Sequence, residues 1–167
     1  RRIDSSRRSP DNTSRDVEQD PMFHNVNRGK LSITVDMTHP QGPPLLKRLA
    51  ATCDIVVENF SPRVMKRYGL DYESLRQVRP DIIMASLAAA GQNGPLKDIV
   101  TYGPTLSSIA GLDYLMGYEG ERVLGLQGAY ADPTAAVFAV FAVLSALYHR
   151  KRTGEGQYID LAQWEAL

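Results

Sequence analysis

The stretch Asp54-Ile55-Val56-Val57-Glu58 decides the fold, because a short aliphatic run is typical of a strand buried in a parallel sheet. On either side of it, strand-like and helix-like patterns alternate. Strands are predicted at residues 31–36 and 81–87, and helices at residues 43–50, 62–68 and 72–78. This alternation predicts βαβ units, whose strands run parallel. The sequence therefore predicts an α/β fold with an open, mostly parallel sheet flanked by helices.

The C-terminal part continues this pattern with an apolar helix and one more strand. The helix is expected to start at Asp132-Pro133-Thr134 and to run to His149, after which basic residues and then a glycine form a helix stop. Residues 157–161 are the further strand. Residues 88–104 are rich in Gly and Pro, and they are predicted to be a loop at the carboxyl end of a strand, where open α/β sheets bind ligands.

Asp132 has two compatible interpretations. An aspartate followed by a proline is typical of a helix start, with Asp132 as the N-cap and Pro133 as the first helical residue. A carboxylate at a helix N-terminus is also favoured in its ionised form by the backbone N–H groups and the dipole. An ionised, positioned carboxylate is what covalent catalysis by aspartate requires. The residues alone leave both interpretations open.

The composition defines the broad class of the protein. The 167 residues carry 19 Lys and Arg against 19 Asp and Glu, and this zero net charge lacks the basic excess of a nucleic-acid binder. Hydrophobic residues make up 43%, which excludes wholesale disorder. The single cysteine, Cys53, cannot form an internal disulfide. The longest apolar run, Ala135–Tyr148, has 14 residues, too few to span a bilayer. With no signal peptide visible, we expect a cytoplasmic protein.

Both ends of the chain suggest a fragment. Residues 1–20 hold ten charged residues and almost no aliphatic ones, so they are predicted to be a charged, extended segment. There is no initiator Met, and residues 163–167 are predicted to lie in the middle of a helix. We expect residues 21–167 to form one partial domain that is truncated at both ends.

Several common chemistries lack their motifs. The three histidines have no metal spacing with another His, Cys or Glu, so no metal site is expected. The Gly-x-Ser-x-Gly elbow, the Gly-Lys-Ser/Thr phosphate loop and the Gly-x-Gly-x-x-Gly dinucleotide motif are all missing. Cys53, at the start of a predicted strand, is interpreted as a small core residue and not as a nucleophile.

Several stretches, taken in order, resemble the motifs of the class III CoA-transferases. Val26–Asp36 is similar to their Asn-(Arg/Asn)-x-Lys-x-Ser-x-x-x-Asp segment, and Asp54–Pro62 to their Asp-(aliphatic)3-Glu-Asn-Phe-Arg-Pro-Gly signature. Gly91–Pro95 is similar to their Gly-Gln-x-Gly-Pro loop, and Arg150–Asp160 to their Arg-x-(Arg/Lys)-Thr-Gly-x-Gly-Gln-x-(aliphatic)-Asp motif. The resemblance covers residues 15–167. It implies the large, Rossmann-like domain of that family, here incomplete.

The resemblance implies an enzyme that transfers coenzyme A from an acyl-CoA donor to a carboxylic acid acceptor. Asp132 matches the nucleophilic aspartate of the family, which forms aspartyl anhydride and aspartyl-CoA thioester intermediates. Splitting the exchange in this way turns one difficult step into several steps of similar energy. Backbone N–H groups in the glycine-rich loops are candidate donors for the developing oxyanions.

The resemblance also implies where coenzyme A binds. Asn59 and Phe60 match a stretch that contacts the pantetheine part, and Arg67 matches a basic residue near the phosphates. Val35 and Thr38 fall where the family holds the adenine, although Thr38 replaces a common lysine. Other interpretations stay open: a core aromatic for Phe60, a turn residue for Asn59 and a solvated helix charge for Arg67.

Two further departures concern the Phe-Arg-Pro-Gly part of the signature. Ser61 and Arg63 replace its arginine and its glycine, so the loop is expected to differ in shape.

Tyr102 bears on the choice within the family. It stands where the related 2-methylacyl-CoA racemases carry a proton-shuttling histidine, and a tyrosine is a poorer base at neutral pH. Tyr102 is therefore expected to line the thioester pocket, or simply to pack in the loop. The racemase remains one alternative function, and a non-catalytic CoA-binding subunit of a heteromeric transferase remains another.

The resemblance further implies what accompanies this chain. Acyl-CoA and a small carboxylic acid are expected as substrates, with no tightly bound cofactor and no nucleic-acid or membrane partner. The family forms interlocked dimers, and a glycine-rich loop and a small domain would follow residue 167. The isolated fragment is therefore expected to be inactive, whereas the identities of donor and acceptor cannot be read from this part of the sequence.

Overall fold

The structure is a computed structural model that describes residues 21–126, 128 and 130–167. The charged segment predicted at residues 1–20 lies outside this described part. The chain divides into two compact units, residues 1–36 and residues 37–167. The described part of the first unit holds helix α1 (Pro21–Val26) and an extended segment after it. The second unit carries the rest of the secondary structure.

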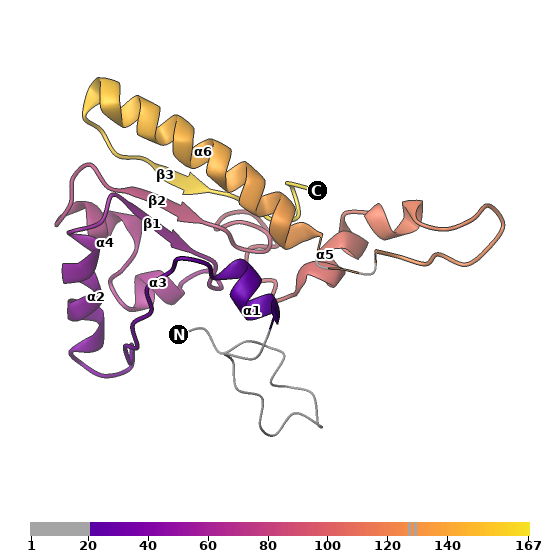
Figure 1. Ribbon diagram of the computed structural model, residues 1–167, viewed down its shortest axis with the longest axis horizontal. Helices are drawn as coiled ribbons and strands as arrows, with labels where there is room; N and C mark the ends of the chain where they lie inside the picture. Colours follow the sequence, from indigo (N-terminus) through magenta and orange to yellow (C-terminus); the bar gives the residue numbers. More distant parts are fainter. Residues whose placement is uncertain (1–20, 127, 129) are drawn as a thin grey trace. The chain divides into compact units, whose positions relative to one another are not determined.

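A parallel sheet forms the centre of the second unit (Figure 1). In the described residues it has three strands, β1 (Ile55–Glu58), β2 (Ile83–Ser86) and β3 (Tyr158–Asp160), in the order β1-β2-β3. Both pairings are parallel. The central strand β2 is buried along its whole length, as expected for a strand covered on both faces. The predicted α/β architecture is confirmed.

Short helices cover one face of the sheet: α2 (Gly42–Ala50), α3 (Val64–Arg67) and α4 (Tyr72–Arg76). A proline in the first turn opens α2, and the Asp71 side chain caps α4 by accepting a hydrogen bond from the Ser74 N–H at 2.8 Å. Leu75 of α4 and Met84 of β2 are each 1% exposed, and they belong to the apolar cluster that joins these helices to the sheet. This cluster is the core of the unit.

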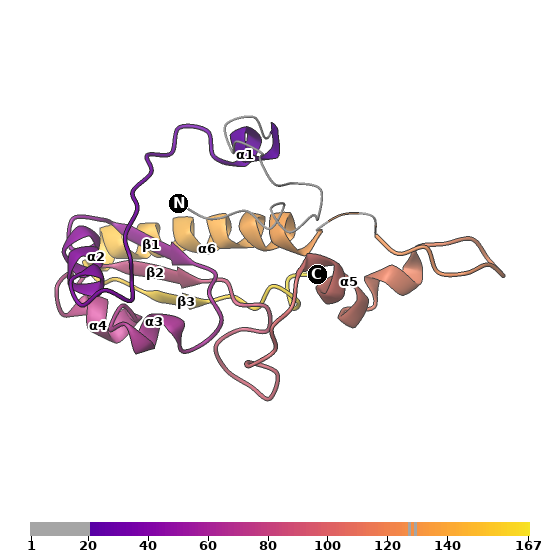
Figure 2. The same cartoon turned by 90° about the horizontal axis from the view of Figure 1, so that it is seen from below.

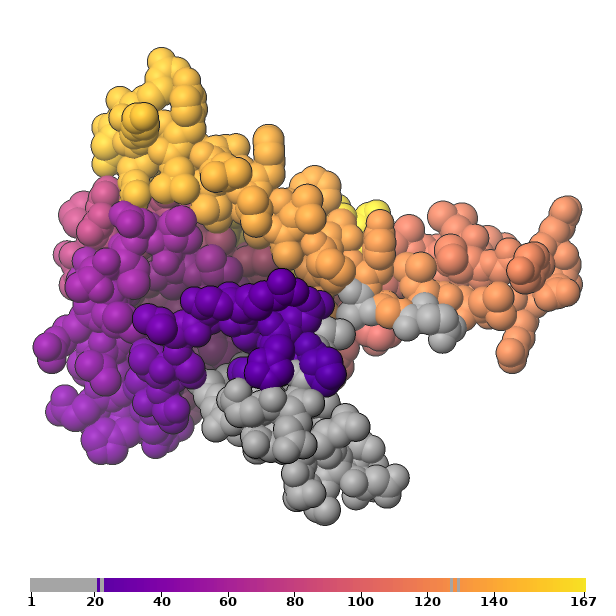
Figure 3. Space-filling view, viewed as in Figure 1, coloured from indigo at the N-terminus to yellow at the C-terminus, as the bar shows by residue number. Residues whose placement is uncertain are grey.

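The long helix α6 (Ala131–Thr153) covers the other face (Figure 2). Its buried residues are all alanines, spaced so that they share one stripe: Ala131, Ala135, Ala139 and Ala146. Because alanine side chains are small, the helix backbone can approach the sheet closely. Figure 3 shows that this helix lies at the surface of the molecule. The opposite face of the helix carries large exposed apolar side chains, among them Val137, Phe141, Leu144 and Tyr148.

The length of α6 corrects one exclusion made from the sequence. The 14-residue apolar run lies inside a 23-residue helix, which is long and apolar enough to cross a membrane by length and composition. Length therefore does not rule out a membrane span here. The alanine stripe against the sheet accounts for one apolar face of this helix, and the exposed face has no partner among the described residues of the second unit.

Three local predictions are wrong. Residues 31–36 form no strand, because no described strand pairs with them, and Leu31 is 99% exposed. Residues 163–166 form a turn instead of helix. The loop predicted at residues 88–104 ends early, because Gly103 and Pro104 open helix α5 (Gly103–Ile109), which a short 3-10 helix (Leu112–Leu115) follows.

Candidate active site

The topology brings the predicted site residues of the second unit to one edge of the sheet. Asn59 and Phe60 follow the last residue of β1. Helix α6 returns the chain from the β2 side to β3, which is parallel to β2, so its N-terminus lies at the carboxyl ends of the strands. Both views show α5 beside that end of α6 (Figures 1 and 2). Asp132 and Tyr102 therefore lie at the edge where open α/β sheets bind ligands.

Asp132 lies inside the first turn of α6 and is exposed. The helix starts at Ala131, so Tyr130 is the N-cap and the prediction that Asp132 caps the helix is wrong. The shift places the carboxylate among the first-turn backbone N–H groups, where the helix dipole favours a negative charge. Within the described part of the chain, the Asp132 carboxylate forms no ion pair or hydrogen bond. It is free to meet a substrate.

Tyr102 is the N-cap residue of α5, in an extended conformation, and its side chain is 62% exposed. It is therefore not packed in the core of a loop. Helices α5 and α6 pack on each other, and both contain fully buried residues, Leu106 at 1% exposure in α5 and Ala131 at 0% in α6. Tyr102 and Asp132 are thus carried by two packed helices.

The turn after β1 is fixed by the last residue of that strand. Glu58 is 7% exposed, and its Oε2 accepts a hydrogen bond from the Phe60 N–H at 2.8 Å. The Phe60 ring is 44% exposed, which corrects its interpretation as a core aromatic, and Asn59 is exposed as well. Both side chains are available to a ligand.

The other predicted contacts of coenzyme A are spread more widely. Arg67 ends α3 and is exposed, with its guanidinium 5.7 Å from the centre of the Tyr68 ring. Thr38 is exposed in the turn before α2. Val35 is half-buried within the first unit, so the structure does not place it relative to the rest. The structure brings Asn59, Phe60, Tyr102 and Asp132 to one edge of the sheet. It does not place Val35 relative to these residues, and Thr38 lies in the turn before α2 and not at a strand end.

The substituted loop before α3 has an unusual backbone. Arg63 adopts φ +76°, in the left-handed region, and it is the only such non-glycine residue in the part of the chain described. Its guanidinium donates to the Asp98 carboxylate at 2.8 Å, and both side chains are exposed. Arg63 therefore holds a backbone conformation that favours glycine, at a cost of about 1–2 kcal/mol.

The glycine-rich loop after β2 is held by the last residue of β3. The Asp160 carboxylate accepts hydrogen bonds from the Gln92 N–H at 2.9 Å and from the Asn93 side-chain amide at 2.9 Å. Gly91 has φ +77°, and a Cβ there would lie 3.4 Å from the Asp160 carboxylate. The Gln92 N–H is therefore committed to Asp160, which removes it from the candidate oxyanion donors.

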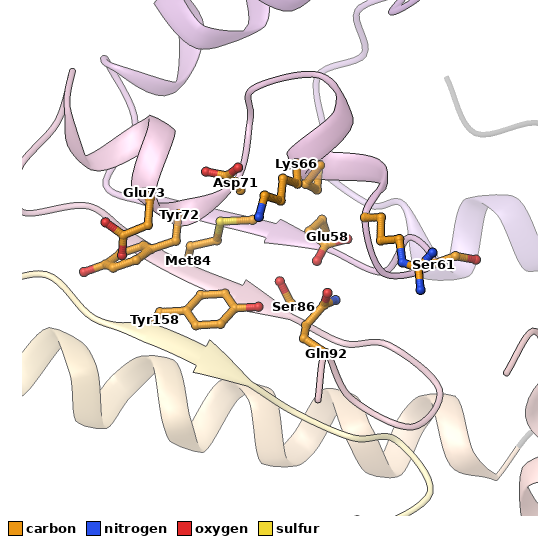
Figure 4. Close-up of a pocket in the computed structure, with 12 residues that line it drawn as sticks. Glu58, Ser61, Lys66, Asp71, Tyr72, Glu73, Met84, Ser86, Gln92 and Tyr158 are labelled. Atoms are coloured by element: carbon orange, nitrogen blue, oxygen red, sulfur yellow. The ribbon is translucent and has the colours of Figure 1, made fainter. Parts of the chain in front are cut away.

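A cavity of about 350 Å³ opens next to this loop (Figure 4). Figure 4 shows the Tyr158 hydroxyl, Ser86 and Gln92 directed toward Glu58, with Lys66 on the opposite side. Burial raises the pKa of the Tyr158 hydroxyl, and the charges of Asp160 and Glu58 add to this effect, although a hydrogen bond with Ser86 opposes it. Tyr158 is therefore neutral at physiological pH and can donate a hydrogen bond.

Sequence reasoning missed this cavity. Its lining residues come from the ends of β1 and β2, the start of β3, and the segments that carry α3 and α4, and the available signal was that Glu58 and Ser86 end parallel strands. None of the predicted site residues lines it, but Glu58 and Ser61 flank Asn59 and Phe60. Among residues 21–126, 128 and 130–167, no group of His, Cys, Asp and Glu has the arrangement of a metal site.

Comparison with known families identifies what this arrangement resembles. The sequence profile of CoA-transferase family III matches residues 1–167. A crystal structure of a CAIB/BAIF family protein from Brucella suis superposes with a TM-score of 0.79 at 37% identity, over 83% of this chain and 36% of that one.

Curated relatives point the same way. The succinate–glutarate CoA-transferase of Agrobacterium fabrum is 39% identical over 140 residues, which are 84% of this chain and 35% of the relative. The beta subunit of the succinyl-CoA–L-malate CoA-transferase of Chloroflexus aurantiacus is 34% identical over 142 residues, again 84% of this chain and 35% of the relative. The chain thus spans about a third of the length of these relatives.

Proposed function

This chain belongs to CoA-transferase family III, and from that membership we propose that the complete protein transfers coenzyme A from an acyl-CoA to a carboxylic acid. We further propose succinyl-CoA as the donor and a dicarboxylic acid as the acceptor. The relatives support this class, because their names combine succinate or succinyl-CoA with glutarate or malate.

The first half of the proposed reaction moves the acyl group to the protein. An Asp132 carboxylate oxygen attacks the carbonyl carbon of the donor thioester, the carbon–sulfur bond breaks, and CoA leaves as a thiolate. The product is a mixed anhydride between Asp132 and the donor acid. The thiolate then attacks the aspartyl carbonyl, which releases the donor as a free carboxylate and leaves an aspartyl-CoA thioester.

The second half runs in the same order with the acceptor. The acceptor carboxylate attacks the aspartyl-CoA carbonyl and expels the thiolate, which forms a second anhydride. The thiolate attacks the acceptor carbonyl of this anhydride, giving the new acyl-CoA and the free Asp132 carboxylate. No net proton is gained or lost, so the chemistry needs a nucleophile and charge stabilisation but no general base.

The observation that carries the proposal is the state of Asp132. It is an exposed carboxylate in the first turn of a 23-residue helix, without a partner among the described side chains. A structural cap would be engaged with the backbone, and a surface charge would have no reason to lie at the ligand-binding edge. Tyr102, exposed at the start of α5, is proposed to line the thioester pocket.

The exposed side chains after β1 and α3 support the binding half of the proposal. The backbone of Phe60 is held by its N–H to Glu58, which places the exposed ring where it can contact an apolar part of pantetheine. Arg67 offers its guanidinium to phosphate, for which the fork of N–H donors is well suited. Asn59 directly precedes Phe60 and can form hydrogen bonds with the amides of pantetheine.

The proposal is tested with the complete protein, succinyl-CoA and a panel of acceptors that contains glutarate, malate and acetate. We expect new acyl-CoA with the dicarboxylates, little with acetate, and ping-pong kinetics because CoA remains on the protein between half-reactions. Asp132→Asn, which keeps the shape and removes the nucleophilic charge, is expected to abolish turnover and to leave CoA binding intact.

Other outcomes identify other functions. Incorporation of solvent deuterium into a 2-methylacyl-CoA without CoA transfer would replace the proposal by the racemase. CoA binding without any turnover, restored only by a second gene product, would replace it by a heteromeric assembly, for which the beta subunit among the relatives is the precedent. Transfer that is unchanged in Asp132→Asn would remove this residue as the nucleophile.

A further inference from the structure

The segment between α5 and α6 forms a projecting arm, residues 111–126, that leaves one helix and returns toward the other (Figures 1 and 2). Its two sides are joined by a hydrogen bond from the Leu124 N–H to the Met116 carbonyl at 2.9 Å, and its tip by one from the Glu121 N–H to the Tyr118 carbonyl at 3.0 Å. The arm therefore has an internal structure of its own.

A single carboxylate closes the base of this arm. Asp113 accepts a hydrogen bond on Oδ1 from the Leu126 N–H at 2.9 Å, thirteen residues further along the chain. Its Oδ2 accepts a second one from the hydroxyl of Ser108, which belongs to α5. Gly125 has φ +70°, and a Cβ there would lie 3.4 Å from the Asp113 carboxyl carbon, so the backbone passes close to the carboxylate.

The charge of Asp113 strengthens this closure. The hydrogen bonds from Leu126 and Ser108 lower the pKa of the Asp113 carboxyl, so it is ionised at neutral pH. Hydrogen bonds to an ionised acceptor are about twice as strong as neutral ones. Asp113 thus ties the end of the arm to α5 with both of its oxygens.

The hydrogen bonds of Asp113 affect the position of Asp132 because they hold the chain shortly before α6 begins. Leu126 is the last residue of the arm, and α6 begins five positions later with the fully buried Ala131. The start of α6 is therefore approached by a short connection whose far end is fixed to α5. The same helix α5 has Tyr102 as its N-cap. Without the Asp113 carboxylate, the Leu126 N–H would lose this hydrogen bond, and the end of the arm would lose its link to Ser108 of α5.

We propose that Asp113 is a positioning residue for the nucleophile Asp132: it fixes the chain that enters α6 to the helix that carries Tyr102. The proposal rests on the proposed function, since it assigns Asp132 the nucleophilic role. Asp113 touches neither substrate nor reacting atoms, and it acts by limiting where the first turn of α6 can lie. A displacement of the nucleophile by about 1 Å is enough to slow a reaction a hundredfold.

The test uses the complete protein and the variants Asp113→Ala and Asp113→Asn. Asparagine can still accept the Leu126 N–H and donate to the Ser108 hydroxyl, whereas alanine can do neither. We expect Asp113→Ala to lower kcat of CoA transfer by about ten- to a hundredfold with little change in KM for the acyl-CoA. Asp113→Asn is expected to restore most of the rate.

Hydrogen exchange supplies a readout that does not depend on turnover. Peptides that contain the Leu126 amide, and separately peptides that cover Ala131–Thr134, are expected to exchange faster in Asp113→Ala than in the wild type. Glu119→Gln is the matched control, because it removes one negative charge at the exposed tip of the same arm. It is expected to change neither exchange nor kcat.

The outcomes separate this proposal from the proposed function. Faster exchange with unchanged kcat in Asp113→Ala would overturn it, and so would a raised KM with unchanged kcat. If Asp113→Ala does not fold, Asp113→Asn decides, since its weaker bonds must raise exchange at Leu126 and lower kcat together. A wild-type protein without any transfer activity would refute the proposed function. In that case the exchange measurement still tests the positioning role, and unchanged exchange at Ala131–Thr134 in Asp113→Ala would overturn it.

Discussion

Replacing Gly156 by alanine is expected to loosen the sheet where β3 begins. A Cβ at this position would lie 2.1 Å from the Ile82 carbonyl oxygen and 2.6 Å from the Asp81 carbonyl carbon, which are both backbone atoms. Ordinary contact begins near 3.4 Å, so the two segments would have to separate by more than 1 Å. The hydrogen bond from the Met84 N–H to the Gln157 carbonyl, 3.0 Å long, lies next to this contact.

The expected cost follows from these two effects. Forcing extra volume into packed structure costs about 1–3 kcal/mol, and the weakened backbone hydrogen bond adds about 1 kcal/mol. We therefore predict that Gly156→Ala lowers the free energy of unfolding by about 2–4 kcal/mol, measured by urea titration of the complete protein.

Gly154, two residues earlier, is the matched control. It has φ +80° and nothing within 4 Å of a Cβ, so its glycine is required by conformation and not by space. Alanine there is expected to cost about 1–2 kcal/mol, and asparagine less, because asparagine tolerates the left-handed region. At Gly156, asparagine is expected to be worse than alanine. A Gly156→Ala protein as stable as the wild type, or the opposite ranking of asparagine at the two sites, would refute this reasoning.

Four further predictions concern other parts of the molecule. Arg150 is 16% exposed and donates hydrogen bonds to Asp54 and to the Asp81 carbonyl. Arg150→Met is therefore expected to lower the free energy of unfolding in urea by about 2–4 kcal/mol, whereas Arg152→Met, at an exposed position, is expected to change it very little. The hydrogen bond from Arg79 lowers the pKa of Asp81, assisted by the charge of Arg150. The ionised carboxylate therefore stabilises the folded state at pH values above the ordinary pKa of 3.8, and this contribution is lost as the pH falls through the lowered pKa. Unfolding free energies measured between pH 2 and 5 should therefore depend less on pH in Arg79→Met. Asp160→Ala is expected to speed hydrogen exchange at Gln92, while Glu155→Ala, which removes an exposed carboxylate 3.7 Å from His149, leaves that amide unchanged. Residues 1–167 expressed alone are predicted to give no CoA transfer in a chromatographic assay of acyl-CoA products, and steady turnover by them would contradict this.

The sequence predicted the parallel sheet because its signals are local. The aliphatic runs that form β1 and β2 follow short turns, and burial in a parallel sheet explains the apolar composition of β2. The segment at residues 31–36 shows the limit of such reasoning. Its alternation is as clear as that of a strand, but pairing depends on a neighbour, and none of the described strands provides one.

The start of α5 was missed for a different reason. The sequence predicts Gly103-Pro104 at the end of a glycine- and proline-rich loop. Proline at the first turn is also typical of a helix start, and burial of Leu106 and Ser107 decides between the two. Which residues become buried depends on the packing of α5 against α6, and sequence spacing does not determine that packing.

The candidate site was predicted in part. Asn59, Phe60, Tyr102 and Asp132 follow from motifs, and the topology brings them to one edge of the sheet. The bonds that hold this edge join residues distant in sequence, such as Asp160 to Gln92 and Asp113 to Leu126. Their partners are set by the path of loops, which has no periodic signal in the sequence, so only the structure could reveal them.

The central claim is that Asp132 carries the acyl group and then coenzyme A. It is tested most directly by trapping. The complete protein is incubated with succinyl-CoA and hydroxylamine, and the peptide that contains Asp132 is analysed by mass spectrometry beside Asp132→Ala. An activated aspartyl group reacts to a stable hydroxamate, so we predict a hydroxamate at Asp132 in the wild type only, formed in proportion to succinyl-CoA. An unmodified Asp132 peptide from a protein that is transferring CoA would contradict the account.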